Sequence, residues 1–151
     1  MKNSTLCYLE RDGKYLMLHR IKKVNDENRD KWIGLGGKVE EGESPHDCIR
    51  REVYEEAGIT LYSVKYRGLI TFVSDEYGTQ YMHLFTSSDF SDVPLRECDE
   101  GVLEWVDKRL VPTLPLWEGD KIFLSLLDTE ERHFSLKLVY RGDELISHFL
   151  E

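Results

Sequence analysis

The stretch of sequence that decides the fold is "GKVEEGESPHDCIRREVYEEAGI", from Gly37 to Ile59. Within it, Ser44 is a good helix N-cap, Pro45 suits the first helical position, and an acidic residue follows three positions after the cap. Gly58 is typical of the residue at which a helix ends. The pattern therefore predicts a helix at about residues 45–57.

This helix carries an unusual density of acidic side chains on one strip. Glu52, Glu55 and Glu56 are three and four residues apart, so their carboxylates lie side by side and repel by a few tenths of a kcal/mol per pair. Arg51 is near Glu55 on the helix and can hold that side chain in place. Either the strip is a solvated acidic face, or it binds something cationic.

The residues just before the helix favour the second interpretation. Gly34, Gly36 and Gly37 give a backbone that can approach a ligand closely, and Lys38 adds a cation. Glu43 contributes one more carboxylate near the helix start. A glycine-rich loop beside clustered carboxylates suggests a site for hard cations with oxygen ligands, namely Mg²⁺ or Mn²⁺ together with phosphates.

The composition limits the class of protein. A chain of 151 residues suits a single domain over residues 1–151, and its net charge of −9 argues against nucleic acid as a partner. There is no apolar run of membrane-spanning length and no signal-peptide core, so we expect no membrane partner and a cytoplasmic location. The three cysteines lack disulfide or zinc spacing and are interpreted as reduced thiols.

The rest of the chain alternates short apolar strands with turn residues. Residues 4–10 and 14–20 predict a hairpin, residues 21–32 a polar loop, and residues 61–74 and 79–88 two long strands joined by "DEYG". Later segments predict a short strand in "LEWV", a second helix in "EGDKIFLSLLD" and a closing hairpin that turns at residues 141–143. Many strands with two helices indicate an α+β or α/β sandwich.

From Gly37 to Ile59 the chain reads G-x5-E-x7-R-E-V-x-E-E-x-G-I, which resembles the Nudix box at all nine specified positions. The wider chain is similar to the MutT-like, 8-oxo-dGTP diphosphatase type of Nudix hydrolase, through "KWIGLGGKVEEGE", "DEGVLEWV", "LWEGD" and the closing hairpin. The resemblance implies the α/β Nudix fold, an α/β/α sandwich with a mixed sheet. It also implies Mg²⁺-dependent hydrolysis (Mn²⁺ substituting) of a nucleoside diphosphate linked to another moiety.

The resemblance also assigns roles to residues. The metal would be held by Glu52, Glu55 and Glu56, with the Gly36 carbonyl and a further acid beyond the long hairpin. Glu100 is the candidate for this acid, with Glu97 and Glu104 as alternatives. Glu56 or Glu55 would orient or deprotonate the attacking water. The residues expected to touch the phosphates are Gly37, Lys38, Lys23 and Arg20, and Arg51 completes the catalytic set.

By the same resemblance, the substrate base would lie near Trp117 and Asp120, with Ile33 and Leu35 along one wall. Trp117 can stack on a base and Asp120 can bond its edge. The mammalian relatives carry an asparagine where this chain has Ile33, and two adjacent aspartates where it has Gly119 and Asp120. Both departures remove polar groups that read an oxidised purine.

The leading hypothesis is a nucleoside triphosphate pyrophosphohydrolase that yields a monophosphate and pyrophosphate, with oxidised purines such as 8-oxo-dGTP as substrates and a role in DNA repair. Its rivals are a Nudix hydrolase of dinucleoside polyphosphates, nucleotide sugars or CTP and dCTP, and a non-catalytic nucleotide sensor. The sensor is disfavoured because every acid of the box is present. The expected partner is a small-molecule nucleotide, and a monomer or a homodimer is expected.

Overall fold

A computed structural model describes residues 2–92 and 97–151 of the chain. The strands in these ranges are β1 (Lys2–Arg11), β2 (Lys14–His19), β3 (Trp32–Ile33), β4 (Leu61–Ser74), β5 (Gly78–Phe90), β6 (Glu97–Cys98), β7 (Gly101–Asp107), β8 (Phe134–Arg141) and β9 (Glu144–Leu150). The helices in the same ranges are α1 (Pro45–Ala57), a 3₁₀ turn (Val111–Thr113) and α2 (Glu118–Thr129).

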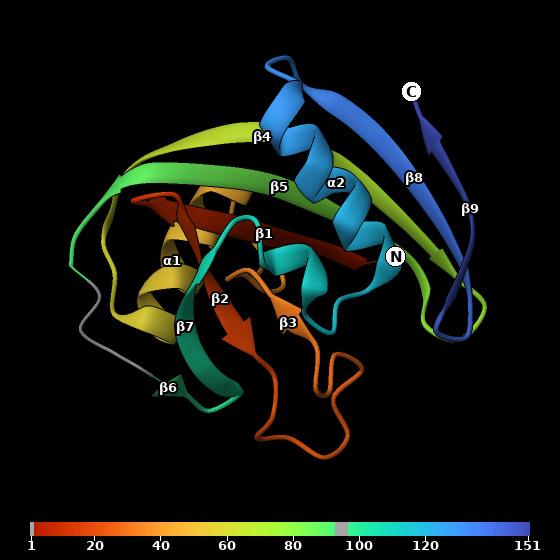
Figure 1. The fold of residues 1–151 in the computed structure, drawn as a ribbon, viewed down its shortest axis with the longest axis horizontal. Coiled ribbons are helices and arrows are strands. Elements are labelled where there is room, and N and C mark those ends of the chain that lie inside the picture. The colour runs from red at the N-terminus through yellow and green to blue at the C-terminus, as the bar shows by residue number, and fades with distance from the viewer. Residues whose placement is uncertain (1, 93–96) are drawn as a thin grey trace.

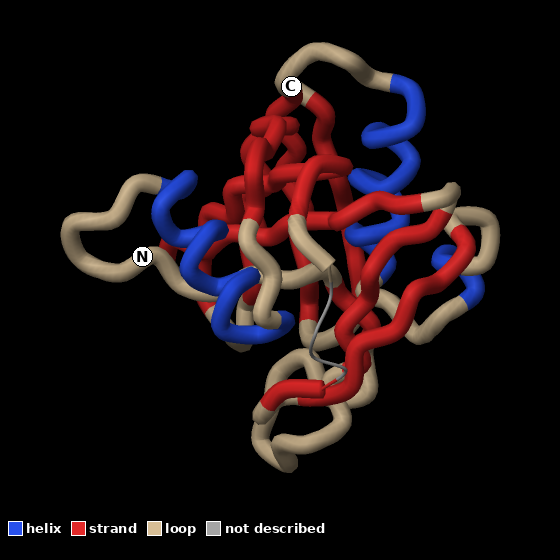
Figure 2. Tube along the Cα trace, turned by 90° about the vertical axis from the view of Figure 1, so that its left-hand side faces the viewer, coloured by secondary structure: helices blue, strands red, loops and turns tan. Residues whose placement is uncertain are grey.

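The strands form one mixed sheet in the order β6-β7-β2-β1-β5-β4-β8-β9, with β3 paired to β2 (Figure 1). The pairs β1–β5 and β4–β8 are parallel, and the remaining pairs are antiparallel. Figure 2 shows the strands between helices that lie on opposite sides. The α/β/α arrangement with a mixed sheet is therefore confirmed.

Helix α1 begins and ends where its sequence predicts. The Ser44 hydroxyl accepts a hydrogen bond from the Asp47 N–H, and the Asp47 carboxylate accepts one from the Ser44 N–H, which completes a capping box. Gly58 adopts the left-handed conformation, φ 68° and ψ 18°, and its N–H donates to the Tyr54 carbonyl. Local chemistry thus fixes both ends of the helix that carries the acidic strip.

The buried side chains form two cores, one on each side of the sheet. The α1-side core contains Cys7, Leu9, Leu16, Leu18, Leu35, Ile49, Val53, Ala57, Ile59, Leu61, Phe85, Phe90 and Leu103. The α2-side core contains Leu6, Tyr8, Tyr15, Met17, Ile70, Met82, Leu84, Val111, Leu116, Phe123, Leu124, Leu127, Phe134, Leu136, Leu138 and Tyr140. Because successive strand residues point to opposite faces, β1 and β2 supply alternate side chains to the two cores.

The predicted hairpins are present, but the first one is shorter than expected. β1 and β2 are in register only beside their turn, at Glu10–Tyr15 and Arg11–Lys14, while β1 runs parallel to β5 along Lys2–Leu9. The long hairpin of β4 and β5 turns between Ser74 and Gly78 as predicted. Within the described residues, no helix has the length and apolar character needed to cross a membrane.

Candidate active site

The glycine loop before α1 lies against strand β1 and reaches the acidic helix. Leu35 exchanges two backbone hydrogen bonds with Cys7, and the Thr5 N–H donates to the Gly37 carbonyl at 2.8 Å. A side chain at Gly36 would collide with the Thr5 carbonyl, so only glycine allows this close approach. The Gly36 N–H then donates to Glu56 Oε1 at 2.8 Å, which ties the loop to the helix.

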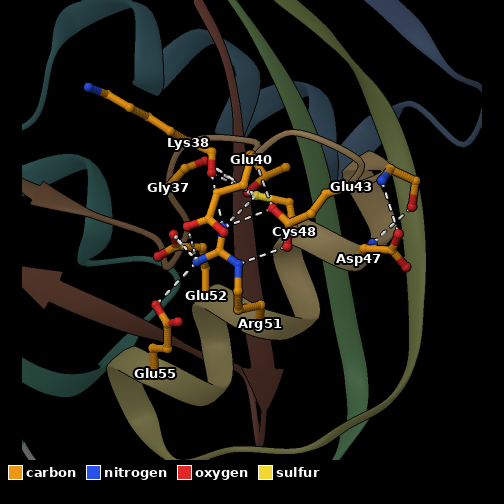
Figure 3. Close-up of polar contacts among 11 residues, drawn as sticks. Gly37, Lys38, Glu40, Glu43, Asp47, Cys48, Arg51, Glu52 and Glu55 are labelled. Carbon is orange, nitrogen blue, oxygen red and sulfur yellow. Dashed lines mark hydrogen bonds and ion pairs between the residues drawn. The ribbon is translucent and has the colours of Figure 1, made fainter.

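Arg51 connects the carboxylates along the outer edge of this site (Figure 3). Its Nε donates to Glu43 Oε2 at 2.8 Å, and its Nη1 donates to Glu52 Oε1 at 2.8 Å and to Glu55 Oε2 at 3.2 Å. Its Nη2 donates to the Lys38 carbonyl at 3.1 Å. One guanidinium thus offsets the repulsion between the acids and orients them, as the sequence predicted for Glu55.

Glu52 is the member of the strip that lines the cavity beside the glycine loop. Its carboxylate packs against Gly37, where any side chain would overlap all its terminal atoms, and it lines a large cavity. Burial raises the pKa of Glu52, although the hydrogen bond from Arg51 opposes the shift. Glu55, by contrast, is 56% exposed at its side chain and is directed to Arg51.

Glu56 and Glu100 lie together at the buried end of the same site. Glu56 is 6% exposed, and Oε2 of each residue is buried without a hydrogen-bond partner among the described residues. Burial raises the pKa of Glu56 well above its usual range, and the neighbouring Glu100 carboxyl raises it further. Two unpartnered buried carboxylate oxygens are costly unless a proton or a cation lies between them.

We call Glu52, Glu56 and Glu100 the carboxylate centre, and it fits a hard divalent cation. The donor set is oxygen-rich, and the Gly36 carbonyl beside it accepts no hydrogen bond from residues 2–92 and 97–151. The predicted ligands Gly36, Glu52, Glu56 and Glu100 are therefore brought together. Glu55 is the most exposed of these acids, and it shares the Nη1 group of Arg51 with Glu52.

A largely buried ion pair of Arg20 and Asp26 connects the carboxylate centre to the loop between β2 and β3. Arg20 Nε donates to Asp26 Oδ2 at 2.7 Å, and Arg20 Nη1 lies 3.1 Å from Glu100 Oε2 without hydrogen-bond alignment. Asp26 Oδ1 accepts from the Asn28 N–H at 3.0 Å. The Asn28 side-chain carbonyl in turn accepts from the Trp117 indole N–H at 2.8 Å. These contacts run from a predicted metal ligand to the predicted base-stacking residue.

Trp117, Asp120 and Tyr140 meet where α2 begins. The Trp117 and Tyr140 rings pack edge to face with centroids 5.5 Å apart, and Lys31 Nζ lies 5.0 Å from the Trp117 ring centroid. Asp120 is 4% exposed, and burial raises the pKa of its carboxyl to about 8 against the attraction of Lys31. This end of the site is aromatic, with a carboxyl group that is largely protonated at neutral pH.

A single cavity of about 970 Å³ contains both ends. At one end it is lined by Gly36, Gly37, Lys38, Glu52 and Glu100, and at the other by Phe72, Trp117, Asp120 and Tyr140. Lys23 and Ile33 also line it. Apart from Leu35, the residues predicted for the phosphate and base regions, including Arg20, thus line one cavity.

The expectation that Leu35 forms part of the cavity wall is wrong. Its side chain is fully buried in the α1-side core and does not line the cavity. Leu35 forms a β-bridge with Cys7 of β1, and this pairing places its side chain under α1. Ile33, in the short strand β3, is half-buried and lines the cavity.

Cys98 and Tyr140 are residues of this site that the sequence interpretation missed. Cys98 Sγ lies in one group with carboxylate oxygens of Glu56 and Glu100. Tyr140 comes from the closing hairpin, and its hydroxyl accepts a hydrogen bond from the Gly119 N–H at 2.8 Å. A side chain at Gly119 would collide with Tyr140 and Leu138, so the glycine in place of an aspartate is explained by the neighbouring phenol.

The comparisons with known proteins agree with this geometry. A family model described as the NUDIX domain matches residues 2–127. The chain is 30% identical over 131 residues to an uncharacterised Nudix hydrolase, YvcI, of Bacillus subtilis (strain 168), covering 84% of this chain and 79% of that protein. It is 30% identical over 122 residues to the oxidized purine nucleoside triphosphate hydrolase of Danio rerio, covering 80% and 78%.

Among solved structures, the crystal structure of a mutator MutT protein from Bacillus halodurans is similar over 100% of this chain and 98% of that one. The TM-score is 0.89 and the sequence identity is 28%. The chain therefore belongs to the Nudix family. It is a Nudix hydrolase of MutT type, and members of this family act on the pyrophosphate bonds of nucleotide derivatives, generally with divalent metal cations.

Proposed function

We propose that this chain hydrolyses purine nucleoside triphosphates to a nucleoside monophosphate and pyrophosphate, with oxidised purines such as 8-oxo-dGTP as its preferred substrates. The observation that carries the proposal is the single cavity of about 970 Å³, which is lined by Glu52 and Glu100 at one end and by Trp117, Asp120 and Tyr140 at the other. A pocket of this size suits a small, mostly enclosed ligand. The similarity to a hydrolase of oxidised purine triphosphates supports the same substrate class.

The carboxylate centre provides the reactive end. Glu52, Glu56 and Glu100 would hold a divalent cation, which when bound polarises phosphoryl oxygens and lowers the pKa of water. Glu56 is buried and has one oxygen free of hydrogen bonds, so it is the residue best placed to hold a water or accept its proton. Lys23 and Lys38, which line the cavity, would bind the phosphates.

The bond changes follow from water attacking the β-phosphorus. The water oxygen forms the new bond, and the bond from the β-phosphorus to the α–β bridging oxygen breaks. The bridging oxygen leaves with the monophosphate, while the water proton passes to a carboxylate and then to solvent. Label from ¹⁸O-water should therefore appear in pyrophosphate and be absent from the monophosphate.

The aromatic end provides base recognition. Trp117 offers an indole face for stacking, and the protonated carboxyl of Asp120 offers both a donor and an acceptor to the edge of a purine. The Tyr140 hydroxyl lies beside Gly119 and adds a second polar group to this end.

The test is a panel of nucleotides with Mg²⁺, scored separately for phosphate and pyrophosphate release. It includes 8-oxo-dGTP, dGTP, dATP, dCTP, a dinucleoside polyphosphate and a nucleotide sugar. We expect pyrophosphate release with the highest kcat/KM on 8-oxo-dGTP. Glu56→Gln should be inactive on every compound, whereas Glu144→Gln, at an exposed position on β9, should match the wild type.

Two outcomes would contradict the proposal. A kcat/KM on a dinucleoside polyphosphate or a nucleotide sugar that exceeds the value on 8-oxo-dGTP would show that the substrate class is wrong. The assignment as a Nudix hydrolase would remain. Asp120→Asn replaces a carboxyl with an amide of the same shape, so it should change the order of kcat/KM values among the nucleotides. If that order stays as in the wild type, Asp120 does not recognise the base.

A further inference from the structure

Cys98 places a thiol inside the carboxylate centre. It lies in β6, paired with Gly101 across the turn that carries Glu100, and its side chain is half-buried. Cys98 Sγ, one carboxylate oxygen of Glu56 and one of Glu100 all lie within 4.8 Å of one another. The thiol therefore shares its space with two of the predicted metal ligands.

This spacing is close to what one metal ion requires. Zinc bonds to sulfur are about 2.3 Å and to carboxylate oxygen about 2.1 Å, so in the tetrahedral geometry that zinc prefers the two donors are about 3.6 Å apart. Donors that already lie within 4.8 Å of one another therefore need to approach by about 1 Å at most. A change of side-chain torsion is sufficient for a shift of that size.

A second, independent observation indicates that a cation belongs among these atoms. Glu56 is 6% exposed, and its Oε2 is buried without a hydrogen-bond partner among the described residues, as is Glu100 Oε2. The other oxygen of Glu56 is fixed by the Gly36 N–H, which keeps the carboxylate facing the group. Glu56 Oε2 is therefore available as a ligand, and Glu100 Oε2, which also faces the Arg20 guanidinium at 3.1 Å, lies beside it.

We propose that Glu56, Glu100 and Cys98 form a mixed oxygen–sulfur site that binds Zn²⁺ or Cd²⁺ in competition with Mg²⁺. Thiolate is a soft ligand that selects zinc-like ions, whereas Mg²⁺ takes oxygen ligands and leaves the thiol aside. On binding, the S–H bond breaks, a metal–sulfur bond forms and the proton passes to solvent. A thiophilic ion held in this way would occupy two carboxylates and inhibit turnover.

The competing explanation is that Cys98 only fills space, because it also packs against the α1-side core. The two explanations differ in metal selectivity. A packing role predicts that replacing Cys98 changes the affinity for all divalent ions alike, through the shape of the site. A ligand role predicts that zinc and cadmium lose affinity while manganese does not.

The experiment is a titration of the metal-free protein with Cd²⁺ in a thiol-free reductant, followed by the thiolate-to-cadmium charge-transfer absorption. One equivalent should produce the band in the wild type and in Cys7→Ala, which removes a thiol fully buried in the α1-side core. Cys98→Ser should lack the band. Its Zn²⁺ affinity should fall by at least the roughly 10- to 100-fold seen when an outer-shell partner is lost, with Mn²⁺ affinity unchanged.

A persistent band in Cys98→Ser, or equal losses of Zn²⁺ and Mn²⁺ affinity, would overturn the proposal. Glu56→Gln and Glu100→Gln should each weaken Cd²⁺ binding, and an unchanged affinity in both would show that the thiol binds cadmium without the carboxylates. If Cys98→Ser does not fold, alkylation of Cys98 in the wild-type protein tests the same proposal. Zn²⁺ should slow this alkylation and Mg²⁺ should not. No nucleotide is present, so the result is independent of the substrate proposed above.

Discussion

Arg20 Nη1 lies 3.1 Å from Glu100 Oε2, so a largely buried guanidinium at the cavity wall is paired with a predicted metal ligand. The same guanidinium holds Asp26, and through Asn28 the contacts continue to the Trp117 indole N–H. The loop between β2 and β3 therefore contacts both ends of the cavity, and its residues should affect substrate binding as well as stability.

Asn28→Ala tests this loop at its contact with the base end. The change removes the acceptor of the Trp117 N–H, a hydrogen bond whose net contribution is typically about 0.5–1.5 kcal/mol. We expect KM for the preferred nucleotide to rise by about 2- to 13-fold while kcat stays near wild type, since the carboxylate centre is untouched. Steady-state kinetics at saturating Mg²⁺ measure both. A fall in kcat with unchanged KM would contradict the assignment.

Glu56→Gln should nearly abolish turnover. The amide retains the shape of the side chain and an oxygen that accepts from the Gly36 N–H, but it cannot serve as a base or an anionic ligand. We expect kcat to fall by at least ~100-fold, the lower end of the usual contribution from general base catalysis. Thermal unfolding without metal should show an equal or higher Tm, because one buried acid is removed. Half of the wild-type activity would rule out the assigned role.

Mg²⁺ should stabilise the wild type against heat more than it stabilises Glu52→Gln. A ligand that binds only the folded state stabilises it by about 2.7 kcal/mol at 100 times its Kd. Glu52 faces the cavity beside Gly37, so its loss should weaken this binding. Thermal denaturation across a Mg²⁺ series gives the shift, with Glu144→Gln as the matched carboxylate control. Identical shifts in wild type and Glu52→Gln would place the cation elsewhere.

Trp117→Ala should weaken nucleotide recognition without affecting phosphate chemistry. Stacking of a base on an aromatic side chain contributes about 1–3 kcal/mol, which is roughly a 5- to 150-fold fall in kcat/KM, mainly through KM. Trp32→Phe is a useful comparison, because Trp32 stacks on His19 away from this contact. A near wild-type KM in Trp117→Ala would return the indole to a packing role.

The free energy of unfolding should decline between about pH 4 and pH 8 in part because of Asp120. Its pKa is raised to about 8 in the folded protein, compared with ~3.9 in an unfolded chain. Within this window the folded state binds more protons, so the stability present at low pH is lost as the pH rises. Chemical denaturation at several pH values should show the wild type losing stability relative to Asp120→Asn. A constant difference between them would contradict the shift.

Local sequence was sufficient to predict α1, because its cap, its first proline and its terminal glycine act within a few residues of one another. The long hairpin was predictable for the same reason. The partnership of β1 with β5 was not, since parallel pairing joins segments about 80 residues apart and leaves no local pattern.

The carboxylate centre was predicted from the Nudix box and from one more acid beyond the long hairpin. The Nudix box does not indicate which residues from other parts of the chain surround the carboxylate centre. The short pairing of β6 with β7 places Cys98 beside the carboxylate centre. The bridge between Leu35 and Cys7 places Leu35 in the α1-side core instead of the cavity wall. Tyr140 reaches Gly119 only because β8 and α2 pack together. Each of these depends on tertiary contacts.

The two cores on opposite faces of the sheet have an evolutionary consequence. The acidic helix packs on one of them, and the residues of the aromatic end, Trp117 and Tyr140, belong to the other. Substitutions that share no neighbours act almost additively on stability. Substitutions in the α2-side core that avoid the Arg20–Asp26–Asn28 contacts should therefore leave the packing of the acidic helix unchanged, which gives this scaffold two faces that selection can alter separately.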